Sequence, residues 1–188
     1  MTKTRIGVIG VGHMGRYHAN ILASLDGVEF VGVADADAGR AEETAARLGA
    51  RAFADYRQLL KKVDAVCVAV PTNYHYRIAS EALEAGVHVL VEKPMTRTVR
   101  YAERLVNLAQ AKKLVLQTGH VGRFNGAIRQ IGSIINGPWL IEARRLAPFS
   151  PRISDVGVVL DLMVHDIDIV LGLLGQEPVA VEAVGHAV

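Results

Sequence analysis

The chain has 188 residues, of which 51% are hydrophobic, and it carries a formal net charge of +2. A chain of this length and composition can bury a hydrophobic core, and it corresponds to one domain or to one domain with part of a second. The net charge is small and no basic cluster is interleaved with aromatic residues, which argues against a nucleic-acid partner.

The N-terminal sequence and the single cysteine favour a cytoplasmic protein. The start, MTKTRIGVIG, lacks the apolar core and cleavage site of a signal peptide, and no apolar run reaches the roughly 18 residues that cross a bilayer. Cys67 lies in the apolar run DAVCVAV, where we expect a buried and inert thiol, as in a reducing compartment. We therefore expect a cytoplasmic location and no membrane partner.

The first two-thirds of the chain alternates between short apolar runs and segments with helical periodicity. The runs are rich in valine and show no polar alternation, which is typical of strands buried on both faces of a parallel sheet. They predict strands over residues 5–9, 30–34, 65–70, 87–91 and 114–117, with helices over 14–25, 41–48, 78–85 and 99–109. This alternation predicts a doubly wound parallel α/β sheet.

The sequence changes character after about residue 119. We predict a helix over residues 124–135, a strand over 139–146, a loop over 148–157, a helix over 160–174 and a final strand over 179–188. We divide the chain into one domain of residues 1–120 and a second of residues 121–188. The second is small for an independent core, and its last strand has no later partner. We therefore expect the start of an α/β domain with an incomplete open sheet.

A glycine-rich turn, GVGHMG, joins the first predicted strand to the first predicted helix. Gly10 suits a tight turn, Gly12 a close approach of the backbone to a pyrophosphate, and Gly15 a close contact between strand and helix. The anion would lie at the helix N-terminus, beside His13 and Met14. The turn therefore predicts a dinucleotide site, and the alternative is an ordinary glycine turn of an α/β protein.

Asp35 ends the second predicted strand, 20 residues after Gly15. Its carboxylate can accept hydrogen bonds from the ribose hydroxyls of an adenosine and would repel a 2′-phosphate, which favours NAD over NADP as the cofactor. Arg40 lies nearby in the sequence and keeps NADP open.

Lys93 follows the fifth predicted strand, at the edge of the sheet where open α/β folds bind their ligands. Pro94 biases the lysine toward an extended backbone, so that its side chain can project into a crevice. Beside a positively charged nicotinamide ring the ammonium form is disfavoured, which suits a residue that transfers a proton or binds a substrate hydroxyl. The alternative is a surface lysine at a strand end.

A polar stripe interrupts the apolar segment LDLMVHDIDI. On a helix, Asp161, His165 and Asp168 fall on one line and the other faces are apolar, so we expect a buried helix whose stripe faces a partner or a cavity. Asp166 points elsewhere and is interpreted as a structural hydrogen-bonding or salt-bridging residue.

Three interpretations of this stripe remain open. It forms an internal hydrogen-bond network, or a metal site, although no further histidine or cysteine at ligand spacing supports a metal. In the third interpretation, Asp161 and His165 form a carboxylate–imidazole pair that faces a polar substrate, with His165 as acid or base. We favour the third and expect no metal.

Four motifs, in this order, resemble the Gfo/Idh/MocA family, named after glucose–fructose oxidoreductase and inositol dehydrogenase. They are RIGVIGVGHMG, VPTNYH, ALEAGVHVLVEKP and VVLDLMVHDID, and they extend from Arg5 to about Gly175. The resemblance implies a Rossmann domain that binds NAD, followed by an α/β domain whose large open sheet carries substrate and oligomer contacts.

The resemblance also implies roles for individual residues. Lys93 would be the catalytic lysine, and Asp161 and His165 the pair on the substrate side. Four residues would line the nicotinamide side of the cofactor site, where plain loop structure is the alternative: Pro71, Thr72, His75 and Glu92.

Two further segments, GHVGRFN and RRLAPFSPRISDVGVVLD, are similar to the branch that acts on nucleotide-linked sugars, especially UDP-N-acetylglucosamine 3-dehydrogenases. Arg123, with Arg144 or Arg145, would meet a diphosphate through charge-assisted hydrogen bonds, or these are ordinary surface or inter-domain arginines.

The sequence thus predicts an NAD-dependent dehydrogenase that oxidises a secondary hydroxyl of a sugar or nucleotide sugar and is a homo-oligomer in its full-length form. A free polyol or sugar dehydrogenase is one alternative. A non-catalytic NAD-binding sensor or an inert fragment is the other, because the family's members are longer than this chain.

Overall fold

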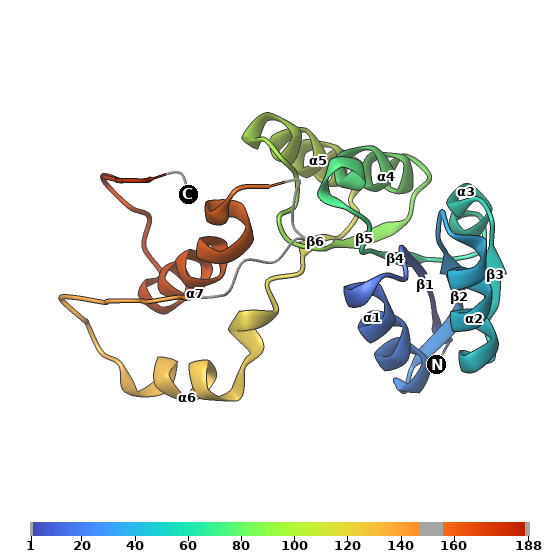
Figure 1. Cartoon of the computed structure of the whole chain (residues 1–188), viewed down its shortest axis with the longest axis horizontal. Coiled ribbons are helices and arrows are strands. Elements are labelled where there is room, and N and C mark those ends of the chain that lie inside the picture. Colours follow the sequence, from blue (N-terminus) through green and yellow to red (C-terminus); the bar gives the residue numbers. More distant parts are fainter. Residues whose placement is uncertain (1, 147–155, 187–188) are drawn as a thin grey trace. The chain divides into compact units, whose positions relative to one another are not determined.

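The computed structural model describes residues 2–146 and 156–186. Contacts divide these residues into two units, one of residues 2–119 with 156–157 and one of residues 120–146 with 158–186. The first unit holds a parallel sheet with its helices, and the second holds helices joined by extended segments (Figure 1). Among the described residues, no helix has the length and apolar character needed to cross a membrane.

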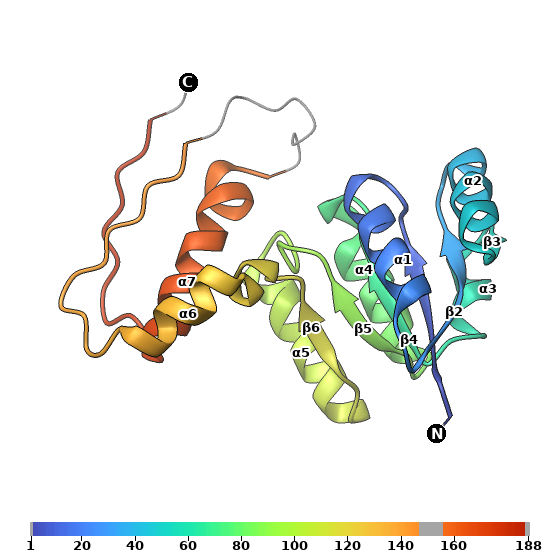
Figure 2. The ribbon, with the colours of Figure 1, turned by 90° about the horizontal axis from the view of Figure 1, so that it is seen from below.

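The first unit is built on a six-stranded parallel sheet in the order β3-β2-β1-β4-β5-β6. From β1 the chain runs outward to β2 and β3, and then crosses to β4 on the other side of β1. Figure 2 shows β4, β5 and β6 following one another across the unit. The strands are β1 (Thr4–Ile9), β2 (Val28–Ala34), β3 (Arg51–Phe53), β4 (Ala65–Val68), β5 (His88–Val91) and β6 (Leu116–Thr118).

The order of the strands reverses between β1 and β4. In an open parallel sheet, ligands bind beyond the carboxyl ends of the strands at such a reversal. The predicted α/β fold class is confirmed, and so are the five predicted strands, with shifted ends. β3 was not predicted because it has only three residues, of which Phe53 alone is buried, and so offers no apolar run.

Helices cover both faces of this sheet. Successive side chains of each strand point to opposite sides, and both sets are apolar, so each face packs against helices. Val8, Val33 and Cys67 pack in one apolar cluster with residues of α1 and α2. Their neighbours Ile9 and Ala34 pack in a second cluster with residues of α3, α4 and α5. The helices are α1 (His13–Ser24), α2 (Ala38–Leu48), α3 (Tyr56–Leu60), α4 (Thr72–Glu84) and α5 (Val99–Lys112).

The described residues of the second unit form four short helical elements. A 3-10 helix, η1 (Val121–Phe124), is followed by α6 (Gly126–Ile134), whose first turn is capped by Asn125 accepting from the Ala127 N–H. A π-helical turn, η2 (Val159–Met163), leads directly into α7 (Val164–Leu174). α7 ends at Gly175, whose φ of 61° is one that glycine adopts without a side-chain clash.

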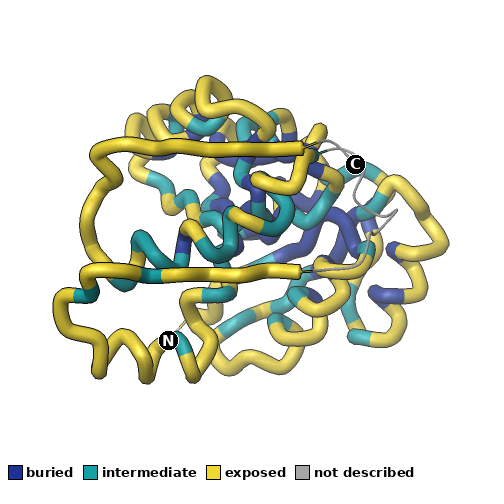
Figure 3. Tube along the Cα trace, turned by 60° about the vertical axis from the view of Figure 1, so that its left-hand side comes forward, coloured by how far each residue is buried: buried dark blue, intermediate teal, exposed yellow. Residues whose placement is uncertain are grey.

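The two strands predicted for the second unit are wrong. Residues 139–146 and 179–186 are not in strands, and nearly all of them are exposed. Exposed residues are yellow in Figure 3. Trp139, for example, is 93% exposed. A strand needs a neighbour for its backbone hydrogen bonds, and no described strand of this unit supplies one. Residues 187–188 and most of the predicted loop, residues 147–155, lie outside the described part of the chain.

The prediction that the second helix of this unit is buried is also wrong. Of the residues in α7 only Asp168 is buried, whereas Ile167 is exposed and most others are half-buried. In the described part of the chain, η1 and η2 pack against α7, and such short elements cannot cover a helix that is apolar nearly all round.

A surface ion pair joins β1 to the segment before β4, and it predicts a pH-dependent stability. Arg5 donates to Asp64 through its guanidinium at 2.6 Å and through its backbone N–H at 2.9 Å. These bonds from Arg5 lower the pKa of Asp64 to about 2. Because the folded pKa lies below the ordinary one, the contribution is present above about pH 4 and is lost as the pH falls through about 2.

We expect Asp64→Asn to lower the thermal midpoint by about 1–3 °C at pH 7, because exposed ion pairs contribute little. The difference from the parent chain should shrink as the pH falls from 4 toward 2, measured by circular dichroism melts. Glu43→Gln, on the exposed side of α2, is the control and should show no such pH dependence. A difference that stays constant down to pH 2 would contradict this account.

Candidate active site

The glycine turn between β1 and α1 leaves open space at the N-terminus of the helix. Gly10 has a φ of 87°, a backbone conformation that other residues rarely adopt. A Cβ added to Gly15 would overlap the carbonyl oxygen of Gly10, so the helix can approach the strand only with glycine there. A Cβ added to Gly12 would meet no atom within 4 Å. His13 and Met14, the first residues of α1, are exposed beside this space.

This space suits an anion. Gly12 is the N-cap of α1 and has no side chain, so the backbone N–H groups of the first helical turn receive no bond from a capping side chain. Such groups, together with the helix dipole, bind phosphate. The cradle that a Cβ at Gly12 would fill therefore fits the pyrophosphate of a dinucleotide.

Asp35, at the carboxyl end of β2, is fixed to the glycine turn. One of its oxygens accepts from the Val11 N–H at 2.7 Å and the other from the Asp37 N–H at 2.9 Å. Arg40 places a guanidinium nitrogen 3.3 Å from the same carboxylate, and its side chain is 44% exposed. The carboxylate is thus held beside the pyrophosphate cradle, with a cation next to it.

The segment after β5 carries Glu92, Lys93 and Pro94. Lys93 is half-buried, and its peptide bond to Pro94 is cis. The Glu92 side chain is only 9% exposed and its Oε1 lies 2.7 Å from Nε2 of His18 in α1. Its Oε2 accepts from the backbone N–H of Lys93 at 3.2 Å. The carboxylate of Glu92 therefore contacts both the α1 side chain His18 and the backbone of the next residue, Lys93.

His75 lies behind two loops of the same sheet edge. Its ring is 1% exposed, with Nδ1 2.9 Å from the carbonyl oxygen of Pro94 and Nε2 2.8 Å from that of Val70. Thr72, at the start of α4, is also buried, whereas Pro71 at its N-cap is exposed. In this position the imidazole joins the segment after β4 to the segment after β5.

Cys67 in β4 offers no reactive thiolate. It is buried, and burial, with a smaller contribution from the charge of Glu92, raises its pKa to about 12. The thiol therefore remains protonated at neutral pH, as an inert core residue does.

In the second unit, the polar residues of α7 bind arginines. Arg123 donates from Nε to Asp168 at 2.7 Å, and this hydrogen bond raises the pKa of Arg123. Arg145 donates twice to Asp166, each bond 2.7 Å long, and lowers the pKa of that carboxyl. The interpretation of Asp166 as a salt-bridging residue is therefore confirmed.

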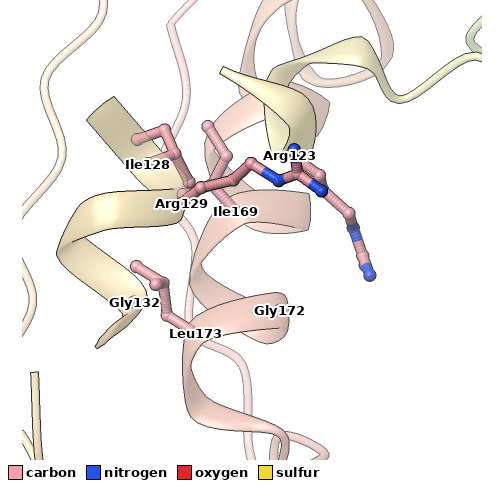
Figure 4. A pocket seen from close by; sticks show the side chains of 7 residues that line it. All are labelled: Arg123, Ile128, Arg129, Gly132, Ile169, Gly172 and Leu173. Atoms are coloured by element: carbon pink, nitrogen blue, oxygen red, sulfur yellow. The ribbon is translucent and has the colours of Figure 1, made fainter. Parts of the chain in front are cut away.

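The arginines considered for a diphosphate site all have carboxylate partners. Arg144 donates to Glu142 at 2.7 Å, and Arg123 and Arg145 bind aspartates of α7. Arg123 nevertheless has a side chain that is half exposed. It also lines a pocket of about 210 Å³ between α6 and α7, with Ile128, Arg129, Gly132, Ile169, Gly172 and Leu173 (Figure 4).

The prediction that one regular α-helix carries Asp161, His165 and Asp168 is wrong. Asp161 lies in the π-helical turn η2, whereas His165 and Asp168 lie in α7. Asp161 and His165 belong to the second unit and Lys93 to the first. Among the described residues, no group of three or more potential ligands could hold a metal ion.

One residue that the sequence did not single out is His18. The one signal in the sequence was that His18 is a polar residue among apolar ones on the same face of the predicted helix. Its partner Glu92 lies 74 residues later, and helical periodicity does not reveal a partner so far along the chain. His120 was also missed; its Nδ1 lies 3.8 Å from Asp168 in the second unit.

The parallel sheet with its reversal, the glycine cradle and the fixed Asp35 define a dinucleotide-binding Rossmann domain of the kind that oxidoreductases use. Residues 4–120 match the family model described as "Oxidoreductase family, NAD-binding Rossmann fold". The chain belongs to this family, Gfo/Idh/MocA, and the predicted membership is confirmed.

Several known proteins are similar to this chain. UDP-N-acetylglucosamine 3-dehydrogenase of Acidithiobacillus ferrooxidans is 48% identical over 100% of this chain and 59% of its own length. Myo-inositol 2-dehydrogenase of Thermotoga maritima is 29% identical over 92% of this chain and 55% of its own length. This chain therefore spans less than two-thirds of the length of these relatives.

Solved structures agree with these comparisons. A structure of the Acidithiobacillus ferrooxidans enzyme matches with a TM-score of 0.92 and 46% identity, over 100% of this chain and 62% of that one. GenD2 from gentamicin A biosynthesis, in complex with NAD, matches with a TM-score of 0.83 and 25% identity, over 93% of this chain and 54% of that one.

Proposed function

We propose that this chain forms the cofactor-binding part and the first portion of the substrate-binding part of an NAD-dependent dehydrogenase for nucleotide sugars. The reaction would oxidise a secondary hydroxyl, with C3 of UDP-N-acetylglucosamine as the first candidate. The observation that carries this proposal is the 48% identity, over the whole chain, to a UDP-N-acetylglucosamine 3-dehydrogenase.

The residues of the first unit fit NAD. The glycine turn would hold the pyrophosphate at the N-terminus of α1, and the fixed carboxylate of Asp35 would accept hydrogen bonds from the adenosine ribose. Bound NAD supplies the acceptor for the hydride that leaves the substrate carbon. Lys93, at the carboxyl end of β5, would take the proton of the substrate hydroxyl in its neutral form, as a general base does.

The residues of α7 and the preceding turn would act on the substrate side. His165 is a second candidate for the proton, since an imidazole can take it up near neutral pH. Asp161 would orient His165 or bind a neighbouring sugar hydroxyl. Arg123, half-exposed beside Asp168, is proposed to meet the diphosphate of the nucleotide, which two charge-assisted hydrogen bonds from a guanidinium would suit.

The cofactor preference rests on Asp35. We expect Asp35→Asn to reduce the preference for NADH over NADPH by at least about tenfold, because the carboxylate no longer repels the 2′-phosphate and the Arg40 guanidinium is already beside it. The dissociation constants of both nucleotides, from nicotinamide fluorescence, measure this ratio.

Two matched variants test the cause. Asp37→Asn removes the neighbouring carboxylate that caps α2 but should leave the preference unchanged. Adding Arg40→Gln to Asp35→Asn should abolish the gain in NADPH affinity. An unchanged preference in Asp35→Asn would refute the assignment of this carboxylate to the ribose.

The function itself is tested by the near-ultraviolet absorbance of NADH formed from NAD and UDP-N-acetylglucosamine, with myo-inositol and free N-acetylglucosamine as competing substrates. The chain is assayed alone and joined to those residues of the Acidithiobacillus ferrooxidans relative that it does not cover. Turnover of UDP-N-acetylglucosamine, with no turnover of myo-inositol or free N-acetylglucosamine, supports the proposal. Turnover of myo-inositol instead would assign an inositol dehydrogenase, and NAD binding without turnover of any of the three would leave a nucleotide-binding protein.

A further inference from the structure

Three elements of the first unit meet at the carboxylate of Glu92. His18 reaches it from α1 at 2.7 Å, and the backbone N–H of Lys93 reaches its other oxygen at 3.2 Å. Gly119, which follows β6, passes so close that an added Cβ would lie 3.2 Å from the carboxylate. The Glu92 side chain is 9% exposed and that of His18 16% exposed, so the contact is almost closed to solvent.

Stability alone is a poor explanation for this pair. Taking a carboxylate out of water is energetically costly, and a buried ion pair returns that cost only with good geometry and further hydrogen bonds. An apolar pair of similar size would fill the same space at no such cost. The pair also lies at the carboxyl edge of the sheet, next to Lys93, where ligands bind in this fold.

The element that supplies His18 is the helix that begins at the glycine turn. α1 starts at His13, directly after the cradle at Gly12. One hydrogen bond from the same helix therefore fixes Glu92, and Glu92 in turn holds the backbone of Lys93. The side-chain contact between His18 and Glu92 thus joins the helix that begins at the pyrophosphate cradle to the segment that carries the lysine.

We propose that His18 and Glu92 are positioning residues that hold Lys93 in its reactive placement relative to the cofactor cradle. This proposal rests on the proposed function, because it assumes that Lys93 acts in the reaction. Neither residue takes a proton from the substrate. Their task is to fix the backbone at Lys93, with α1 as the support.

The main test compares His18→Leu with His18→Gln. Leucine fills the space but cannot donate, whereas the Nε2 amide of glutamine can donate to Glu92 in place of the imidazole. We expect His18→Leu to lower kcat about tenfold or more while the affinity for NAD changes less than about threefold, since small misplacements of a reacting group reduce rate rather than binding. His18→Gln should retain kcat within about threefold.

The coupling between the two residues gives a second measurement. In a Glu92→Gln background, His18→Leu should lower kcat by less than about twofold further, because both changes break the same contact. Asn20→Leu, on the exposed side of the same helix, is the control for a general disturbance of α1 and should leave kcat unchanged. Thermal melts establish that each variant is folded.

A third measurement does not depend on turnover. The rate at which trinitrobenzenesulfonate labels Lys93, relative to the exposed Lys61 of the same chain, is followed by peptide mass spectrometry. His18→Leu should change this ratio at least about threefold and His18→Gln should not, because only the first releases the segment that carries Lys93.

These readouts separate the two proposals. A changed labelling ratio in a protein that oxidises none of the tested sugars would refute the proposed function and leave the contact between His18 and Glu92 as the one that fixes the segment of Lys93. Turnover and labelling that are both unaffected by His18→Leu would overturn the positioning role and leave the proposed function intact. Equal losses in the leucine and glutamine variants would also overturn it, since the hydrogen bond would then not matter.

Discussion

Gly15→Ala is expected to destabilise the first unit by at least about 3 kcal/mol and to lower its thermal midpoint by about 6–12 °C. The added Cβ would overlap the carbonyl oxygen of Gly10, a backbone atom that cannot turn away as a side chain does. Gly10 is itself fixed by its N–H bond to the Ala34 carbonyl at 2.7 Å and by a φ of 87°. Relief of the overlap therefore requires α1 to move away from the sheet.

Gly12→Ala should separate cofactor binding from stability. Its added methyl group meets no atom within 4 Å, and its φ of −67° is open to any residue, so we expect a change of less than about 2 °C in the thermal midpoint. The methyl group would stand in the space assigned to the pyrophosphate, so the affinity for NAD should fall at least about tenfold. Melts monitored by circular dichroism and titrations of NADH fluorescence measure both quantities.

The pair of variants has a clear contradictory outcome. If Gly12→Ala bound NAD as tightly as the parent chain, the open space above the glycine turn would not be the pyrophosphate site. If Gly15→Ala were as stable as the parent, the close approach of α1 to the strand would not be what requires glycine at that position.

The sheet was predictable because its pattern is local. Strands of a parallel sheet are apolar on both faces, so runs such as the one in β4 stand out from the helices that follow them. The glycine turn was predictable for the same reason, since strand, turn and helix are adjacent in sequence. The short α3 was missed because five residues hold less than two helical turns and show no period.

The errors in the second unit come from the opposite situation. The residues of 139–146 and 179–186 have the apolar character of strands, yet a strand exists only with a hydrogen-bonded neighbour, and the sequence of one segment does not reveal whether a neighbour is present. α7 likewise has an apolar surface wider than its described neighbours can cover. Apolar composition predicts what a segment is able to bury, and the available partners decide how much it does bury.

The site shows the same division. Lys93 and Asp35 were found from their places at strand ends, and that placement is confirmed because the strands are where they were predicted. The contact between His18 and Glu92 joins residues far apart in sequence, and nothing local marks it. The hydrogen bond from Arg123 to Asp168 was likewise not predicted, because the two residues are 45 positions apart. The sequence suggested only that Arg123 would meet an anionic ligand.

Lys93→Ala is expected to lower kcat by about 10²–10⁴ in the form of the protein that turns over the nucleotide sugar, because this is the usual contribution of a positioned general base. The affinity for NAD should change little, since the glycine turn and Asp35 are the residues proposed to hold the other end of the dinucleotide. Lys61→Ala, at the exposed end of α3, is the matched control and should leave kcat unchanged.

His165→Ala decides which residue takes the proton. If Lys93 is the base, a small primary amine added to Lys93→Ala should restore part of the lost rate, and added imidazole should not. In that case His165→Ala should lose rate because the substrate is misplaced, and its KM should rise. If His165 is the base, imidazole rescues His165→Ala and the amine has no effect on Lys93→Ala. Retention of turnover in both variants would show that neither Lys93 nor His165 takes the proton. The assignment of the base would then be refuted, because these are the two residues proposed for that role.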